Sequence, residues 1–255
     1  MHRPRLIPVL LLKGKGLVKS KAFKEYRYIG DPINTVKIFN DAQADELILL
    51  DIDATKEKRI IPLEIVRKIG EEAHMPFAIG GGIQNMQQIK ELINAGAERV
   101  IINTIAGLNP HFIKEAADTF GTTTIVVCMD VKKDFWGNEK VWISNGTKSL
   151  AYSPVEYAML MERNGAGEII VQSIKNDGMM NGYDINLIKR IVEAVSIPVV
   201  GLGGAGNLQH MQEAASKSHL NGLAAGSMFL YQGPKQGVLI NYPQKTNINL
   251  YSGNE

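Results

Sequence analysis

The sequence predicts an α/β protein, a (β/α)₈ (TIM) barrel built from two half-barrel repeats. Eight short apolar runs alternate with helical patterns, as in a parallel sheet covered by helices. Phe77–Gly82 resembles Pro198–Gly204, so that Gly81 and Gly82 match Gly203 and Gly204 at an offset of 122 residues. The length of 255 residues suits one such barrel. No linker divides the chain, so we expect a single domain over residues 1–255.

The eight predicted strands are apolar without strict alternation, as expected for strands buried on both faces. They are Leu6–Leu11, Glu46–Asp51, Phe77–Ile79, Arg99–Ile102, Thr124–Met129, Glu168–Gln172, Pro198–Gly201 and Gly222–Ala225. The first apolar run, Leu6–Leu12, is too short to span a bilayer, and no small-residue cleavage site follows it. A buried strand is therefore a better interpretation than a signal or membrane segment.

Helical patterns lie between the predicted strands. They are Pro32–Ala42, Pro62–Glu72, Met86–Ala95, Pro110–Thr119, Pro154–Asn164, Ile185–Ala194 and Leu208–Ser216. Four of them begin with proline, which suits the first turn of a helix. Two segments depart from the repeat. Residues 132–146 predict a hairpin inserted after the fifth strand, and the tail over 233–255 shows little helical pattern where an eighth helix is expected.

Composition excludes several classes of protein. A net charge of +2 does not indicate a nucleic-acid surface. A single cysteine, Cys128, rules out an intrachain disulfide and fits a reducing compartment, so we expect a cytoplasmic protein. The five histidines lie in predicted helices or loop flanks, and none ends a strand, so we expect neither a metal nor another cofactor. Cys128 reads as a packed core thiol rather than a nucleophile.

Glycine and small polar residues follow four predicted strands in two matching pairs. Gly80–Gly82 and then Asn103-Thr104 follow strands three and four, while Gly203-Gly204 and Gly226-Ser227 follow strands seven and eight. Backbone N–H groups in such loops can approach phosphate oxygens closely. Tight turns use the same residues, so plain turn-making remains an alternative. The pairing favours two phosphate sites, one at each end of a substrate.

Asp130 ends the fifth apolar strand and is expected to point into the mouth of the barrel. A carboxylate among apolar strands can have a raised pKa and act as a general acid or base. The alternative is a charge paired with Lys132 or Lys13. At an offset of 119 residues the repeat places Leu11 opposite Asp130. Because leucine cannot transfer a proton, a site that once used two aspartates would have lost one.

From about Arg5 to Tyr231, the chain resembles the cyclase subunits of imidazole glycerol phosphate synthase. The resemblance implies a (β/α)₈ barrel that binds a glutaminase at its bottom face and receives ammonia through its core. The motifs that carry it are Gly30-Asp31-Pro32, Glu46–Asp51, Phe77–Ile83, Ile102-Asn103-Thr104, Gly165–Ile169, Asp177-Gly178, Asn181–Asp184 and Gly203–Gly206.

The resemblance also implies roles for single residues. In that family two aspartates at the mouth are the acid–base catalysts; Asp130 matches the second, and Leu11 occupies the place of the first. Lys19 matches the lysine of a mobile first loop. The implied phosphate ligands are Gly82, Asn103 and Thr104 at one site, and Asp177, Gly178, Gly203, Gly204, Gly226 and Ser227 at the other. The implied ring of charges at the ammonia entry is Arg5, Glu46, Arg99 and Glu168; salt bridges that plug the barrel base are the alternative.

Other departures from the family indicate a changed substrate. Asp53, Met179 and Leu202 replace small hydroxyl residues. The chain resembles a divergent branch associated with glycosyl amidation, whose barrels and glutaminases supply ammonia for acetamidino sugars of surface polysaccharides, together with a separate amidotransferase. A cyclase of histidine biosynthesis and a non-catalytic ammonia conduit remain alternatives.

Overall fold

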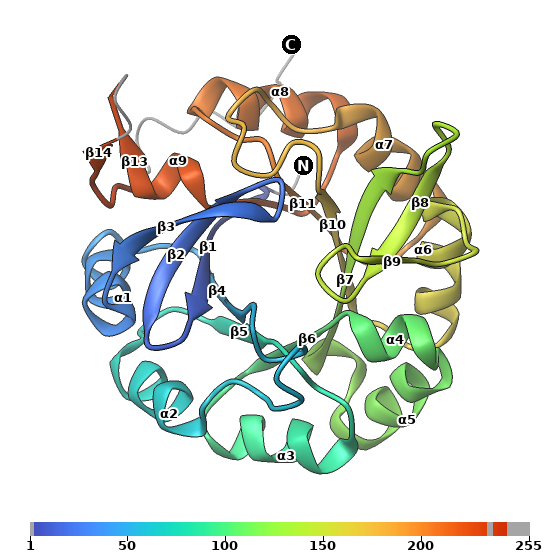
Figure 1. Cartoon of the computed structure of the whole chain (residues 1–255), viewed down its shortest axis with the longest axis horizontal. Helices are drawn as coiled ribbons and strands as arrows, with labels where there is room; N and C mark the ends of the chain where they lie inside the picture. Colours follow the sequence, from blue (N-terminus) through green and yellow to red (C-terminus); the bar gives the residue numbers. More distant parts are fainter. Residues whose placement is uncertain (1–2, 234–236, 244–255) are drawn as a thin grey trace.

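The computed structural model describes residues 3–233 and 237–243, and it confirms the predicted (β/α)₈ barrel (Figure 1). Eight parallel strands follow one another around the axis, and the barrel closes where the first strand pairs with the last. The strands are β1 (Arg5–Lys13), β4 (Leu47–Asp51), β5 (Phe77–Gly80), β6 (Arg99–Ile102), β7 (Ile125–Lys133), β10 (Glu168–Ser173), β11 (Val199–Leu202) and β12 (Gly222–Ala225). All eight predicted strands are present, although β1 and β7 run further toward the mouth than their apolar residues do.

Helices surround the barrel, as the periodicity predicts (Figure 1). The long ones are α1 (Pro32–Asp41), α2 (Leu63–Glu72), α3 (Met86–Asn94), α5 (His111–Phe120), α6 (Pro154–Arg163), α7 (Ile185–Ala194) and α8 (Leu208–Ser218). Short ones are α4 (Thr104–Leu108), η1 (Thr122–Thr124) and α9 (Ser227–Leu230). Ser153 begins α6 with a complete capping box, in which its side chain accepts from the N–H of Glu156. In the described ranges, no helix is long and apolar enough to cross a membrane.

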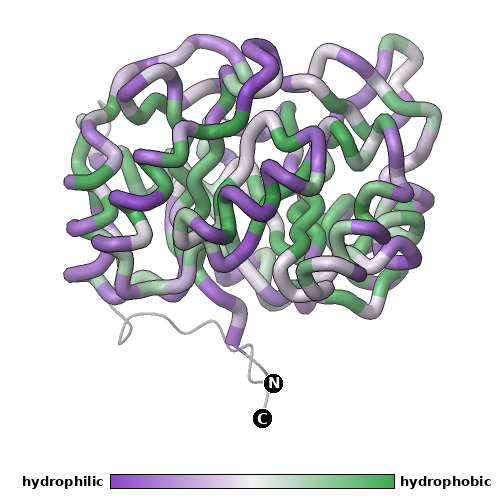
Figure 2. Tube along the Cα trace, turned by 90° about the horizontal axis from the view of Figure 1, so that it is seen from below, coloured by the Kyte–Doolittle hydropathy of each residue, from purple (hydrophilic) through white to green (hydrophobic). Residues whose placement is uncertain are grey.

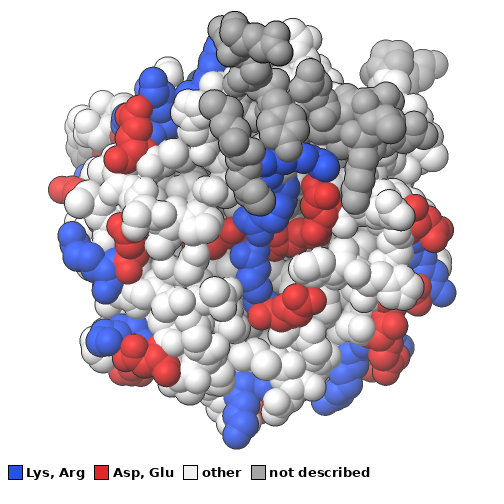
Figure 3. Space-filling model, turned by 180° about the vertical axis from the view of Figure 1, so that it is seen from behind, with Lys and Arg blue, Asp and Glu red and all other residues white. Residues whose placement is uncertain are grey.

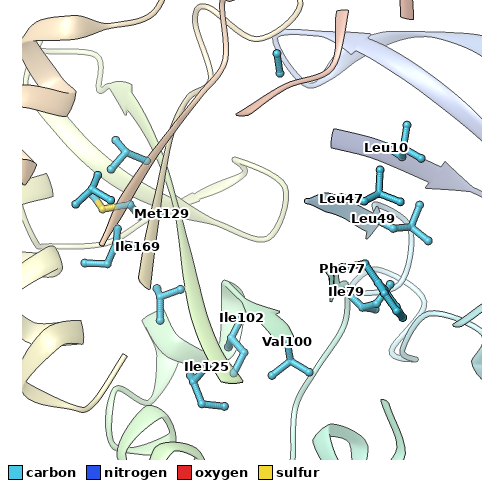
Figure 4. Packing of buried hydrophobic residues seen from close by; sticks show 14 of the residues in the cluster. Leu10, Leu47, Leu49, Phe77, Ile79, Val100, Ile102, Ile125, Met129 and Ile169 are labelled. Carbon is cyan, nitrogen blue, oxygen red and sulfur yellow. The ribbon is translucent and has the colours of Figure 1, made fainter. Parts of the chain in front are cut away.

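The strands bury two layers of side chains because successive residues point to opposite faces. Residues such as Leu10, Ile79 and Ile169 pack outward against the helices (Figure 4). The alternate residues, among them Ile7 and Val126, fill the inside of the barrel with a continuous apolar column. Hydrophobic stretches accordingly run through the interior, and hydrophilic residues lie on the outside (Figure 2). Function must therefore sit at the two ends of this column.

Three hairpins add to the barrel. One is β2 (Gly16–Lys21) with β3 (Lys24–Gly30), which the apolar pattern does not predict. The second lies in the segment 132–146, where β8 (Glu139–Ile143) pairs back on β7 and carries β9 (Lys148–Ser149). The third joins β13 (Tyr231–Gln232) to β14 (Gly237–Val238) after α9. Residues 234–236 and 244–255 of the tail lie outside the described residues.

The described part of the tail is anchored to the barrel by Tyr242. Its ring stacks on Phe229 at 5.5 Å between centroids, and its hydroxyl donates to the carbonyl of Leu6 at 3.1 Å. The same hydroxyl accepts from the N–H of Asp45 at 3.1 Å. An extended segment thus packs where the repeat leads one to expect an eighth helix.

Candidate active site

A cavity opens at the mouth of the barrel, where the parallel strands end. Because β1 and β7 extend toward it, they carry Leu11 and Asp130 into the same space. The β2–β3 hairpin covers this end of the barrel and contributes Phe23 and Tyr26 to the lining. Asn145 donates to the carbonyl of Ile52 at 2.7 Å and lines the cavity as well. The mouth is therefore a roofed site lined by two buried carboxyl groups, those of Asp51 and Asp130.

Asp130 is buried, and each of its carboxyl oxygens accepts a bond from a neighbouring side chain. Asn103 Nδ2 donates to Asp130 Oδ2 at 3.2 Å, and it also donates to the carbonyl of Cys128 at 2.9 Å. The thiol of Cys128 donates weakly to Asp130 Oδ1 at 3.7 Å. Burial raises the pKa of Asp130 to about 7, although the bonds from Cys128 and Asn103 lower it in part. A carboxyl group with this pKa can both take and give a proton near neutral pH.

The lysines considered as partners of Asp130 have contacts elsewhere. Lys132 Nζ donates to the carbonyl of Gly146 at 2.9 Å and lies 3.8 Å from the centre of the Trp142 ring. Lys13 Nζ contacts both carboxylate oxygens of Asp53, at 2.8 and 3.1 Å. Neither lysine therefore pairs with Asp130, whose carboxyl group faces the cavity.

Leu11 lines the same cavity on the apolar side. It stands beside Leu50 in the register of β1 and β4, and beside Val18 in the register of β1 and β2. Leu50 lines the cavity too. Across from the carboxyl of Asp130 the wall is therefore hydrocarbon, which cannot exchange a proton.

The residues expected at the first phosphate site meet in this cavity. Gly82, Asn103 and Thr104 line it together with Asp130. Gly82 has φ of +72°, and a Cβ there would lie 1.8 Å from the carbonyl oxygen of Arg59. Thr104 Oγ1 accepts from the N–H of Ser144 at 3.2 Å. Gly82 is thus required by a close backbone crossing, whatever else it binds.

Most residues expected at the second phosphate site gather beneath the β2–β3 hairpin. Lys19, Gly178 and Ser227 line a second cavity there, and Gly226 packs against the Lys19 side chain. Lys19 Nζ lies 3.2 Å from Asp177 Oδ1. Ser227 Oγ is buried and has no hydrogen-bond partner within the described residues. A buried cation beside an unused hydroxyl suits an anion.

Gly203 and Gly204 support the loop between β10 and α7. A Cβ on Gly204 would lie 2.0 Å from the carbonyl oxygen of Gly182, and one on Gly203 would lie 2.8 Å from that of Ser173. Both glycines have φ near +100°, a conformation that favours glycine. These contacts require glycine at both positions, whether or not a phosphate binds there.

Replacing Gly178 with alanine is expected to lift the hairpin from the site. Gly178 has φ of +72°, and an added Cβ would lie 2.1 Å from the carbonyl oxygen of Ser20. Gly233→Ala is a matched control, because Gly233 has φ of +74° and open space around it. We expect Gly178→Ala to lower the free energy of unfolding by about 1–3 kcal/mol more than the control, measured by denaturant unfolding. Equal losses of stability in the two variants would mean that the positive φ alone is destabilising and that the approach to Ser20 is not.

The opposite end of the barrel is closed by a ring of four charges. Arg5 and Arg99 each contact both Glu46 and Glu168; the distances are 2.5 Å for Arg5–Glu46, 2.6 Å for Arg99–Glu46 and 2.8 Å for Arg99–Glu168. Both carboxylates are buried, and burial raises the pKa of Glu46. Acidic and basic side chains meet near the centre of this face (Figure 3). All four residues expected there thus stand in one ring at the base of the apolar column.

Sequence reasoning missed several residues that line the mouth. Ser20, Phe23 and Tyr26 come from the unpredicted hairpin, for which the spacing of Tyr26 and Tyr28 by two residues was the available signal. Gln172 also lines the cavity but reads in sequence as the end of an apolar strand. Across the described ranges, no three His, Cys, Asp or Glu side chains converge as a metal site needs.

Comparison with known proteins gives matches over nearly the whole chain. The model of the histidine biosynthesis protein family matches residues 5–234. A Pseudomonas aeruginosa protein, provisionally named imidazole glycerol phosphate synthase subunit hisF2, is 40% identical over 98% of this chain and 100% of its own length. A provisionally named subunit HisF of Leptospira borgpetersenii is 42% identical over 97% and 98% of the two chains. The imidazole glycerol phosphate synthase subunit HisF of Geobacillus kaustophilus is 37% identical over 98% and 100%.

Proposed function

The chain belongs to the histidine biosynthesis protein family, among the HisF-like cyclase subunits of imidazole glycerol phosphate synthase, and we propose that it is an ammonia-using barrel subunit with a changed acceptor. In this proposal a glutaminase binds the bottom face, and its ammonia enters past Arg99 and travels along the apolar column. A phosphorylated substrate binds at the mouth of the barrel, beside Asp130. The acceptor is an N-acetyl sugar that becomes an acetamidino sugar in surface-polysaccharide synthesis, with a separate amidotransferase as third partner.

One observation supports the proposal that the acceptor has changed. Two buried carboxyl groups line the cavity, but Asp51 is held by Arg59 and by two backbone N–H groups. Asp130 is therefore the carboxyl without a cationic partner, and it faces the side chains of Leu11 and Leu50. An acid–base pair is worth about 10²–10⁴-fold in rate for each member. A dedicated cyclase that needs a proton donor at position 11 would lose that factor. The anion-binding features around Lys19 and Ser227 support a phosphorylated ligand in either case.

Specific observations also support two alternatives to the proposed function. The pKa of about 7 at Asp130 suits the cyclase reaction of histidine biosynthesis, with Leu11 dispensable. The ring of Arg5, Glu46, Arg99 and Glu168 with the apolar column suits a conduit that passes ammonia without chemistry of its own. Both alternatives retain the glutaminase partner.

The deciding experiment compares the wild type with Leu11→Asp. Turnover is measured with the bis-phosphorylated nucleotide substrate of the cyclases and saturating ammonium. We expect little turnover by the wild type and about 10²–10⁴-fold more by Leu11→Asp, since the variant restores a carboxyl opposite Asp130. Leu50→Asp is the matched control, because it adds a carboxyl to the same apolar wall on the neighbouring strand.

Each outcome of this experiment distinguishes between the proposed function and its alternatives. Rapid turnover by the wild type would contradict the changed acceptor and restore the histidine-pathway cyclase. Activity in Leu11→Asp alone would show that the pocket still binds the nucleotide but lacks the acid–base pair. If none of the three proteins turns over the nucleotide, N-acetyl sugars are the acceptors to test next.

A further inference from the structure

Gln172 carries a side-chain amide at the wall of the mouth cavity whose nitrogen makes no hydrogen bond to the described residues. The residue lies on β10 and stands beside Asp130 in the register of β10 and β7. Its side chain lines the mouth cavity and is 92% buried, since the residue is 8% exposed. Its oxygen accepts a weak bond from the thiol of Cys128 at 4.0 Å. Among residues 3–233 and 237–243, nothing accepts a hydrogen bond from its nitrogen.

The other buried polar side chains nearby behave differently. Asp51 accepts from the backbone N–H groups of Asp53 and Ala54 and contacts Arg59 at 2.5 Å. Asp177 accepts from Ser20 and Lys19. The amide of Gln172 is largely removed from solvent yet has no strong partner in the protein, so its nitrogen is left to a group in the cavity.

The wall around Gln172 is polar on one side and apolar on the other. Asn103, which follows β6, forms one side with Asp130 of β7 and Gln172 of β10, and these strands are neighbours. Leu11 and Leu50, from β1 and β4, form the opposite side. A ligand between them meets hydrogen-bonding groups along one edge and hydrocarbon on the other.

We propose that Gln172 is a substrate-binding residue whose side-chain N–H donates to an acceptor atom of the ligand beside Asp130. The ligand class is a phosphorylated molecule with an oxygen or ring nitrogen as acceptor and a neighbouring N–H or O–H that faces the carboxyl of Asp130. The assignment rests on the proposed function only in taking the mouth as the substrate site. It makes Gln172 a determinant of specificity, distinct from the acid–base role given to Asp130.

The first test needs no ligand. Gln172→Met keeps the length of the side chain and removes the amide, so thermal unfolding of the variant should occur at the wild-type temperature or above it. Gln209→Met, on the exposed surface of α8, is the matched control. A melting temperature several degrees below that of the control would mean that the fold itself uses the amide, and the proposal would be wrong.

The second test measures binding of imidazole glycerol phosphate, the compound in the relatives' name, by calorimetry. Loss of one hydrogen bond to the ring should weaken binding by about tenfold in Gln172→Met and leave Gln209→Met unchanged. Binding of glycerol phosphate, which lacks the ring, should be equal in all three proteins. Unchanged ring binding in Gln172→Met would overturn the proposal.

The two tests keep this proposal apart from the proposed function. If the wild type binds neither imidazole glycerol phosphate nor glycerol phosphate although Gln172→Met is as stable as the wild type, then the mouth has no site for phosphorylated ligands and the proposed function has to be revised. The stability result would still support a ligand-facing Gln172. If the variant is unstable, Gln172 is structural and the proposed function is untouched.

Discussion

Asp130→Asn is expected to abolish ammonium-dependent turnover of the Leu11→Asp protein and, at the same time, to stabilise the fold above pH 7. The loss of turnover should be about 10²–10⁴-fold, because asparagine cannot take up or release the proton. The gain in stability should reach about 4 kcal/mol, because the variant no longer holds a buried carboxylate. Activity and denaturant unfolding, both followed from pH 4 to pH 9, measure the two effects.

The sign of the pH effect follows from the raised pKa. Burial raises the pKa of Asp130 from 3.8 to about 7, so the folded protein holds the proton more tightly than the unfolded chain does. The stability that this carboxyl contributes is full below pH of about 3.8, decreases as the pH rises, and is lost above about 7. The difference between wild type and Asp130→Asn should therefore change between these limits and stay flat above them.

A surface variant shows whether the effect belongs to the site. Asp41→Asn removes an exposed carboxylate at the end of α1, so it should alter neither turnover nor the shape of the pH curve. Intact pathway function in Asp130→Asn would exclude acid–base chemistry by this residue and favour the ammonia conduit.

The fold could be predicted because its signals are local and repeated. Strands such as β4 and β11 are short apolar runs, and helices such as α6 begin at a Ser-Pro pair with glutamate three residues after the serine. Each signal depends on a few neighbouring residues, and it recurs along the chain because the barrel repeats the same β/α unit. The half-barrel repeat then fixes which strands correspond, and the positions of Leu11 and Asp130 follow.

The roof of the site could not be predicted in this way. In the β2–β3 hairpin, β3 is mostly exposed and β2 buries the polar Lys19 and Ser20, so hydrophobic periodicity does not reveal it. Gln172 is a polar residue at the end of an apolar strand, and only the register with β7 brings it beside Asp130. Asp51 ends a predicted strand, and its partner Arg59 comes from a loop that closes back on that strand. These relations depend on contacts between distant segments, which a sequence pattern does not record.

Charge reversal at the base of the barrel should be the most destabilising of the changes considered. Arg99 contacts Glu46 at 2.6 Å and Glu168 at 2.8 Å, and both carboxylates are buried. Arg99→Glu leaves three carboxylates with the single cation of Arg5, so the free energy of unfolding should fall by about 3–5 kcal/mol. Arg67→Glu, on the exposed face of α2, makes the same reversal and should cost less than about 0.5 kcal/mol.

The double variant Arg99→Glu with Glu168→Arg separates a structural ring from an entrance for ammonia. It restores opposite charges at the Arg99–Glu168 contact, so most of the lost stability should return. With the glutaminase present, turnover on glutamine is then compared with turnover on ammonium. If the ring only plugs the barrel base, both activities recover together with stability. If ammonia enters there, turnover on glutamine stays low while turnover on ammonium recovers, because the passage depends on which strand carries each charge as well as on the total charge.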